Sequence, residues 1–126
     1  MSFNKVTYLV LLKKYFLFII AILLVNLGVA NDFYWVGNSG NWNDASHWSA
    51  SSGGNGGVGI PTQSDNVIFD ENSFKKNGEL TINGNVYCNS FTSSTKKNLT
   101  ISASNSASLK IGKDFNKAFV ENMVEE

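Results

Sequence analysis

The sequence contains no arginine, and only one cysteine, one proline and one histidine occur among its 126 residues. The single cysteine, Cys88, cannot form an internal disulfide, so the chain is not a small domain held together by disulfide bonds. Cys88 lies in an alternating, strand-like run, and we expect a buried, unreactive thiol there. The absence of arginine argues against nucleic acid as a partner, because phosphate contacts and base recognition depend on clustered arginine and lysine.

Positive charge is sparse beyond the first 30 residues. Seven of the ten lysines and all ten acidic residues lie in residues 31–126, which gives this part a formal charge of −3. Its only basic runs are two lysine pairs, at 75–76 and at 96–97. Each pair stands beside turn-forming residues, so we expect solvated loop tips there.

The first 30 residues have the composition of an export signal. The positively charged start contains three lysines, Lys5, Lys13 and Lys14. Residues 16–25 form an unbroken apolar run, and Gly28 and Ala30 place small residues at the −3 and −1 positions for cleavage before Asn31. The alternative is a membrane anchor over residues 15–30, but that run is short against the roughly 20 residues that a membrane-spanning helix needs. We therefore expect a cleaved signal peptide and a secreted or outer cell-surface protein.

The stretch 33–48 holds every tryptophan of the chain. Its notable residues are Trp35, Gly37, Gly40, Trp42, Asp44, Ser46, His47 and Trp48. The two glycines disfavour a helix, because each costs roughly 1 kcal/mol relative to alanine. The pattern predicts two short aromatic segments joined by a tight turn. We expect Asp44 and Ser46 to hydrogen-bond local amides, and nothing marks the lone His47 as a general base.

A glycine-rich segment follows at 49–59, with five glycines in eleven residues. Its composition is typical of a flexible loop or of a tight excursion over one end of a domain. It is not a phosphate-binding loop, because no Gly-Lys-Ser/Thr sequence opens a helix here. Pro61 ends the loop, and 66–69 reads as a short strand.

From Leu80 onward, brief strands alternate with polar turns. The expected strands are 80–82, 86–88, 99–101 and 109–111, each with apolar side chains two residues apart. The triplet Leu-Thr-Ile occurs at 80–82 and again at 99–101, which predicts parallel strands with Leu80 above Leu99 and Ile82 above Ile101. Short strands at a spacing near twenty are typical of a parallel β-solenoid. The alternative is a small antiparallel β-sandwich, which also uses short strands.

A longer pattern favours the solenoid. The run Tyr34-Trp-Val-Gly-x-Ser-Gly-x-Trp-x-Asp-x-x-His-Trp48 is followed by Ser-Gly-Gly and by Pro61-Thr-x-x-Asp65-Asn-Val-Ile-Phe-Asp70. This pattern resembles the amino-terminal start of the β-solenoid regions in large bacterial adhesin-like surface proteins, including those exported by type IX secretion and those with autotransporter-type repeats. The resemblance covers about residues 33–112. It implies a secreted or cell-surface right-handed parallel β-helix whose first coil is capped by the tryptophan stretch, and it implies no catalytic residues.

The expected organisation has four parts. They are a signal peptide at 1–30, a Trp/Gly-rich cap and loop at 31–65, β-solenoid coils at 66–114, and an irregular or short helical tail at 115–126. The structural cap is assigned to Trp35, Gly37, Gly40, Trp42, Asp44 and Trp48. Proteins of the resembled type continue for many hundreds of residues, so we expect this chain to be a fragment without their downstream domains.

Three functional hypotheses follow. The first is a structural or adhesive surface module without catalysis, cofactor or metal. The second is a carbohydrate-binding module in which Trp35, Trp42 or Trp48 offers an exposed ring to a surface glycan. The third is the remnant of a polysaccharide-degrading β-helix enzyme. The local acidic residues Asp65, Asp70 and Glu71 read as solvated turn residues, and without an Asp-x-Asp-x-Asp-Gly loop they do not support a calcium site.

Overall fold

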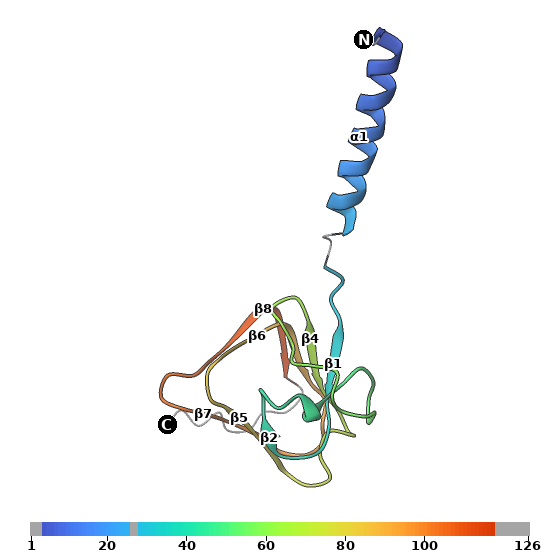
Figure 1. Ribbon diagram of the computed structural model, residues 1–126. Helices are drawn as coiled ribbons and strands as arrows, with labels where there is room; N and C mark the ends of the chain where they lie inside the picture. The colour runs from blue at the N-terminus through green and yellow to red at the C-terminus, as the bar shows by residue number, and fades with distance from the viewer. Residues whose placement is uncertain (1–3, 26–27, 118–126) are drawn as a thin grey trace.

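The computed structural model describes residues 4–25 and 28–117, whereas residues 1–3, 26–27 and 118–126 lie outside this description. One α-helix, α1 (Lys5–Val25), precedes a domain built almost entirely of β-strands (Figure 1). The helix starts at Asn4, whose side-chain oxygen accepts hydrogen bonds from the amide and the hydroxyl of Thr7 at 2.9 and 2.8 Å. Among the described residues, no helix combines the length and the apolar character required to cross a membrane.

The β domain has eight strands and one short 3-10 helix within residues 28–117. They are β1 (Asp32–Trp35), β2 (Gly40–Asn41), the 3-10 helix η1 (Ala45–His47), β3 (Trp48–Ser49), β4 (Asn66–Phe69), β5 (Gly78–Ile82), β6 (Asn85–Ser93), β7 (Leu99–Ala103) and β8 (Ser108–Lys117). They form one sheet in the order β3-β1-β4-β6-β8 and a second in the order β2-β5-β7.

The chain alternates between the two sheets and adds strands in layers. The first layer contains β1 and β2, the second β4 and β5, and the third β6 and β7, while β8 begins a fourth. Every neighbouring pair runs parallel except β1 and β3. The antiparallel sandwich is therefore wrong in its strand pairing, because no two consecutive strands among the described residues pair with one another as a hairpin.

Parallel pairing of the two Leu-Thr-Ile strands is confirmed, but their predicted register is wrong by two residues. Leu80 is opposite Ile101, and Leu99 is opposite Gly78. A shift of two residues keeps every side chain on its original face, so both registers bury the same apolar residues. Burial alone therefore does not select between the two registers. The connection that precedes each strand selects the observed one. The amide of Gly78 donates to the carbonyl of Asn98 at 2.9 Å, which holds the starts of β5 and β7 together.

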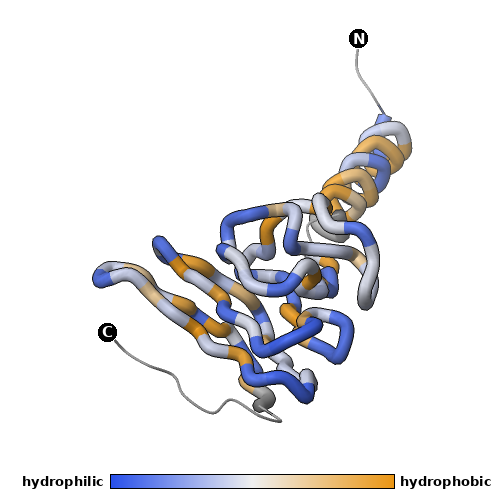
Figure 2. The backbone as a smooth tube through the Cα atoms, turned by 90° about the horizontal axis from the view of Figure 1, so that it is seen from below, coloured by the Kyte–Doolittle hydropathy of each residue, from blue (hydrophilic) through white to orange (hydrophobic). Residues whose placement is uncertain are grey.

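The core lies between the two sheets, where apolar positions line up across neighbouring strands (Figure 2). A column of stacked rings follows the first sheet through all four layers. The rings are Trp35, Phe69, Phe91 and Phe115, with successive centroids 5.5, 5.1 and 5.6 Å apart. The first three rings are fully buried, and Phe115 is half exposed. Offset stacking at these distances is favourable beyond the area that it buries.

Two of the predicted segment boundaries need correction. Residues 32–41, assigned to the cap, provide the two strands of the first layer, and the excursion from 42 to 65 returns to the first sheet only as β3. Residues 115–117, assigned to the tail, belong to β8 because Phe115 pairs with Phe91 and stacks on it. The rest of the predicted tail, 118–126, lies outside the described residues.

Candidate functional site: the tryptophan cluster

Two short segments joined by a turn are confirmed as β1 and β2, but only β1 contains aromatic residues, and Trp42 directly follows β2. The turn between them depends on positive φ at Gly37 (85°) and Asn38 (68°), a region that glycine and asparagine tolerate best. The turn directs β1 into one sheet and β2 into the other, so the two segments do not form a hairpin.

All three tryptophans are fully buried, with an exposed fraction of zero. The ring of Trp48 meets Trp35 edge-on at 4.9 Å and Trp42 at 5.0 Å, and Trp35 also stacks on Phe69. A sugar needs an open ring face on which to stack, and this packing leaves none. The proposed glycan contacts at Trp35, Trp42 and Trp48 are therefore contradicted by their burial.

Two of the three indole N–H groups donate a hydrogen bond to a nearby backbone carbonyl. The indole nitrogen of Trp35 donates to the carbonyl of Asn38 at 2.7 Å, and that of Trp48 donates to the carbonyl of Trp42 at 2.7 Å. The indole nitrogen of Trp42 is buried without a hydrogen-bond partner among the described residues. Trp42 consequently stabilises the fold by burying apolar area, and its unsatisfied N–H group reduces that stabilisation.

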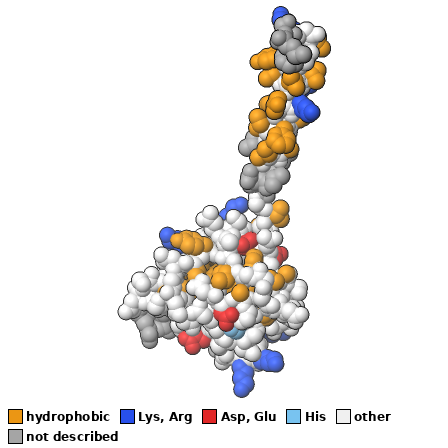
Figure 3. All heavy atoms as spheres, viewed as in Figure 1, with side chains coloured by type: hydrophobic (Ala, Val, Ile, Leu, Met, Phe, Trp, Pro, Cys, Tyr) orange, Lys and Arg blue, Asp and Glu red, His pale blue; other side chains and the backbone are white. Residues whose placement is uncertain are grey.

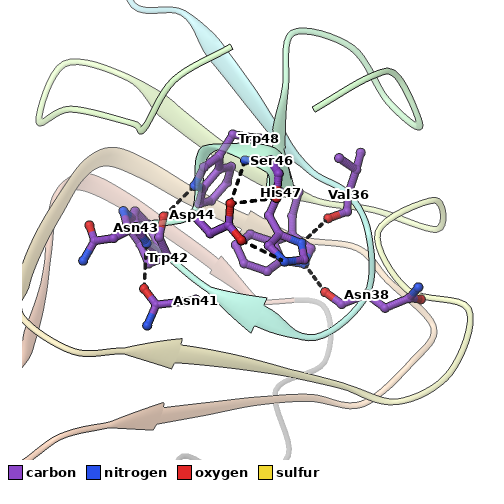
Figure 4. A network of polar contacts seen from close by, with 10 residues as sticks. Val36, Asn38, Asn41, Trp42, Asn43, Asp44, Ser46, His47 and Trp48 are labelled. Carbon is purple, nitrogen blue, oxygen red and sulfur yellow. Dashed lines mark hydrogen bonds and ion pairs between the residues drawn. The ribbon is translucent and has the colours of Figure 1, made fainter. Parts of the chain in front are cut away.

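His47 completes the cluster as a stacked ring. It lies parallel to Trp35, with ring centroids 4.6 Å apart and an interplanar angle of 4°. Its Nδ1 lies 2.7 Å from the carbonyl oxygen of Val36, which can only accept, so Nδ1 carries the hydrogen (Figure 4). The ring also explains Gly40, because a Cβ at that position would lie 2.1 Å from Nε2 of His47.

The predicted hydrogen bond to a local amide is confirmed for Asp44, whereas the hydroxyl of Ser46 bonds the carboxylate of Asp44 and not an amide. An Asp44 oxygen accepts from the amide of Ser46 at 3.0 Å and from its hydroxyl at 2.7 Å, which caps η1. The hydroxyl and amide of Ser46, with a smaller contribution from His47, hold the pKa of Asp44 below its ordinary value. The other oxygen of Asp44 lies 3.9 Å from Nε2 of His47. The hydroxyl of Ser46 is directed to Asp44 and not to the imidazole, so these three residues do not form a nucleophile–base–acid relay.

The glycine-rich segment makes a tight excursion against η1. The amide of Gly57 donates to the carbonyls of Ala45 and Trp48 at 2.9 and 3.0 Å. A Cβ at Gly56 would lie 1.7 Å from the carbonyl oxygen of Ser46, so only glycine permits this approach. The segment thus lies against the short helix that carries His47.

Asp65 is buried, with an exposed fraction of 5%, so its assignment as a solvated turn residue is wrong. One oxygen accepts from the amide and the hydroxyl of Thr62, each at 2.8 Å, and the other from the backbone and side-chain amides of Asn31, each at 3.3 Å. Burial raises the pKa of Asp65, but these hydrogen bonds together outweigh it, so the pKa lies below its ordinary value. Asp65 therefore joins the chain just before β1 to the end of the excursion.

The remaining candidates for chemistry are isolated. In the part of the chain that the structure describes, no three His, Cys, Asp or Glu residues lie close enough together to hold a metal ion. The predicted burial of Cys88 is confirmed, and burial raises the pKa of its thiol to about 11. A thiol in that state is a poor nucleophile.

The sequence interpretation missed one grouping. The lysine pairs at 75–76 and 96–97 occupy the same corner of consecutive layers, and both are followed by asparagine. The signal was present in the sequence as the tripeptide Lys-Lys-Asn, repeated at 75–77 and 96–98.

No family model matches this chain, and neither a curated protein nor a solved structure matches it.

Proposed function

We propose that the chain forms the amino-terminal part of an exported structural or adhesion-type surface module, folded as a parallel β-helix and without catalytic activity. The observation that carries the structural role is the complete burial of Trp35, Trp42 and Trp48, whereas export rests on the apolar run at 16–25 and the small residues that follow it. A stacked β structure exposes apolar surface at its first layer, and terminal repeats need a special covering. The tryptophans, the antiparallel strand β3 and the excursion 42–65 supply that covering.

The layered pairing supports the β-helix. Asn66 of β4 pairs with Ser90 of β6, and Asn85 of β6 pairs with Ser108 of β8, each time one layer further along. Crossovers between parallel strands are right-handed in nearly all proteins, so we expect a right-handed helix.

Export is the part of the proposal that is most directly tested. In a Gram-negative host, the mature protein should begin at Asn31, as measured by intact mass. Replacing Ala30 with Glu should abolish cleavage, because the −1 position needs a small residue, whereas Val29→Glu at the unconstrained −2 position should still be processed. A parent chain that keeps residues 1–30 and fractionates with the inner membrane would contradict secretion and favour the anchor.

The structural role of the tryptophans is tested separately. We expect Trp35→Ala and Trp48→Ala to lower the midpoint of thermal unfolding strongly, since emptying a buried aromatic site costs about 3–5 kcal/mol. Variants that unfold like the parent would contradict the cap.

A further inference from the structure

The tripeptide Lys-Lys-Asn occurs twice, at 75–77 and at 96–98, and all six residues are exposed. The first copy lies between β4 and β5 and the second between β6 and β7. Each copy therefore lies where the chain passes from the first sheet to the second, in consecutive layers.

Hydrogen bonds hold the two copies in register. The amide of Asn98 donates to the side-chain oxygen of Asn77 at 3.2 Å, and the carbonyl of Asn98 accepts from Gly78 at 2.9 Å. Each lysine pair directly precedes one of these hydrogen-bonded asparagines, so the two pairs lie at the same corner of consecutive layers.

These four lysines form a concentration of positive charge, and Glu79, the nearest acidic residue along the chain, accepts a hydrogen bond from the hydroxyl of Ser102 at 2.6 Å. Within the described residues, no salt bridge joins the corner lysines to an acidic side chain. Lysine side chains also project from the end of the β domain opposite α1 in the space-filling view (Figure 3).

Beside the lysines lies an open hollow of about 390 Å³, lined by Asn38, Ser39, Lys75, Lys76 and Asn77. Hydrogen bonds to backbone amides hold two of its lining side chains in place. The side-chain oxygen of Asn38 accepts from the amide of Lys75 at 2.8 Å, and the hydroxyl oxygen of Ser39 accepts from the amide of Glu79 at 2.9 Å. The hollow therefore joins the first two layers and offers amide, hydroxyl and ammonium groups together.

We propose that this corner, defined by Asn38, Ser39 and the two Lys-Lys-Asn copies, binds a linear acidic polysaccharide. The lysines pair with carboxylates spaced along the polymer, and the asparagine and serine side chains meet its hydroxyl groups. This inference names a partner class for the proposed surface module and rests on that proposal. The hollow contains no aromatic residue on which a base could stack and no arginine, which disfavours a nucleic acid.

The test is binding of the purified protein from an exporting host to polygalacturonate, with amylose as the uncharged control polymer. Lys75→Gln/Lys76→Gln and Lys96→Gln/Lys97→Gln should each weaken binding roughly twofold to thirtyfold, as expected for two surface ion pairs. The matched control is Lys110→Gln/Lys113→Gln on β8, which removes the same charge elsewhere and should change affinity less than about twofold. Lys75→Arg/Lys76→Arg should retain binding, and added salt should weaken it.

The outcomes separate this inference from the proposed function. Equal losses in the corner and control variants would mean that only net charge matters, and this would overturn the assignment. Tighter binding to single-stranded DNA or to phosphatidylserine vesicles than to polygalacturonate would overturn it in favour of those partners. Absence of polygalacturonate binding would overturn it as well, while leaving the cleavage and unfolding tests of the surface module unaffected.

Discussion

Gly40 and His47 provide the sharpest test of the packing in the tryptophan cluster. A Cβ at Gly40 would lie 2.1 Å from Nε2 of His47, so Gly40→Ala must displace the imidazole. The displaced ring loses its parallel stack on Trp35, worth roughly 0.5–1.5 kcal/mol. It also loses the 2.7 Å hydrogen bond from Nδ1 to Val36, worth about 0.5–1.5 kcal/mol. We therefore expect Gly40→Ala to lower the free energy of unfolding by roughly 1–3 kcal/mol.

The matched experiment is a double-mutant cycle measured by urea unfolding with tryptophan fluorescence. His47→Ala alone loses the same two interactions, so adding Gly40→Ala to it should cost little more. The coupling free energy should be roughly 1–3 kcal/mol, well above the few tenths seen for independent sites. If Gly40→Ala destabilises the protein equally with and without the imidazole, steric contact with His47 is not the reason for glycine at this position.

Three further predictions concern buried polar groups. Trp42→Ala should lower the free energy of unfolding by about 3–5 kcal/mol. Trp42→Phe should lower it by less than about 1.5 kcal/mol, because this change removes the unpartnered indole N–H group together with little volume. The unfolding midpoints of the two variants would distinguish loss of volume from removal of the unsatisfied donor. Asp65→Asn should destabilise at neutral pH by roughly 1–3 kcal/mol, because an amide group then faces the donors of Thr62 or Asn31. Since the folded pKa of Asp65 is lowered, its contribution to the free energy of unfolding is present above about pH 4 and is lost as the pH falls through the folded pKa. A difference in stability between the parent and Asp65→Asn that stays constant across an acid titration would refute this contribution. Cys88, whose pKa is raised to about 11, should resist a thiol reagent at pH 8 until urea unfolds the domain; rapid labelling of the folded protein would contradict its burial.

Strand periodicity predicted much of the fold but not its register. Alternating apolar residues identified the strands containing Leu80 and Leu99 and their parallel pairing. The matching Leu-Thr-Ile triplets suggested a spacing of 19, but a two-residue slip preserves the buried face and is invisible to hydrophobic patterning. The Lys-Lys-Asn repeat carries the correct spacing of 21 because its asparagines hydrogen-bond between layers. Polar corner residues were the better guide to alignment.

The tryptophan stretch was recognised as an aromatic cluster from composition, but two of its features depended on tertiary contacts. The stacking of His47 on Trp35 brings together residues from β1 and η1, and no local pattern encodes that approach. Asp65 looked solvated because it follows Pro61 and precedes a strand, yet Asn31, 34 residues earlier, supplies two of its hydrogen bonds. Burial of a carboxylate depends on such distant donors, which a turn-forming sequence does not reveal.

The layered pairing also determines how the domain must fold. Tyr34 pairs with Ile68 and Asn66 with Ser90, so each layer closes only after a loop of more than 20 residues has been ordered. Such non-local pairing has a high contact order, which places folding in the range of milliseconds to seconds, because loop entropy is lost before contacts compensate it. Only the short β1–β3 pair is antiparallel among the described strands. A newly made chain therefore stays unfolded for longer than a helical domain of the same size, and this delay would favour the export that we propose, in which the chain crosses a membrane before it folds.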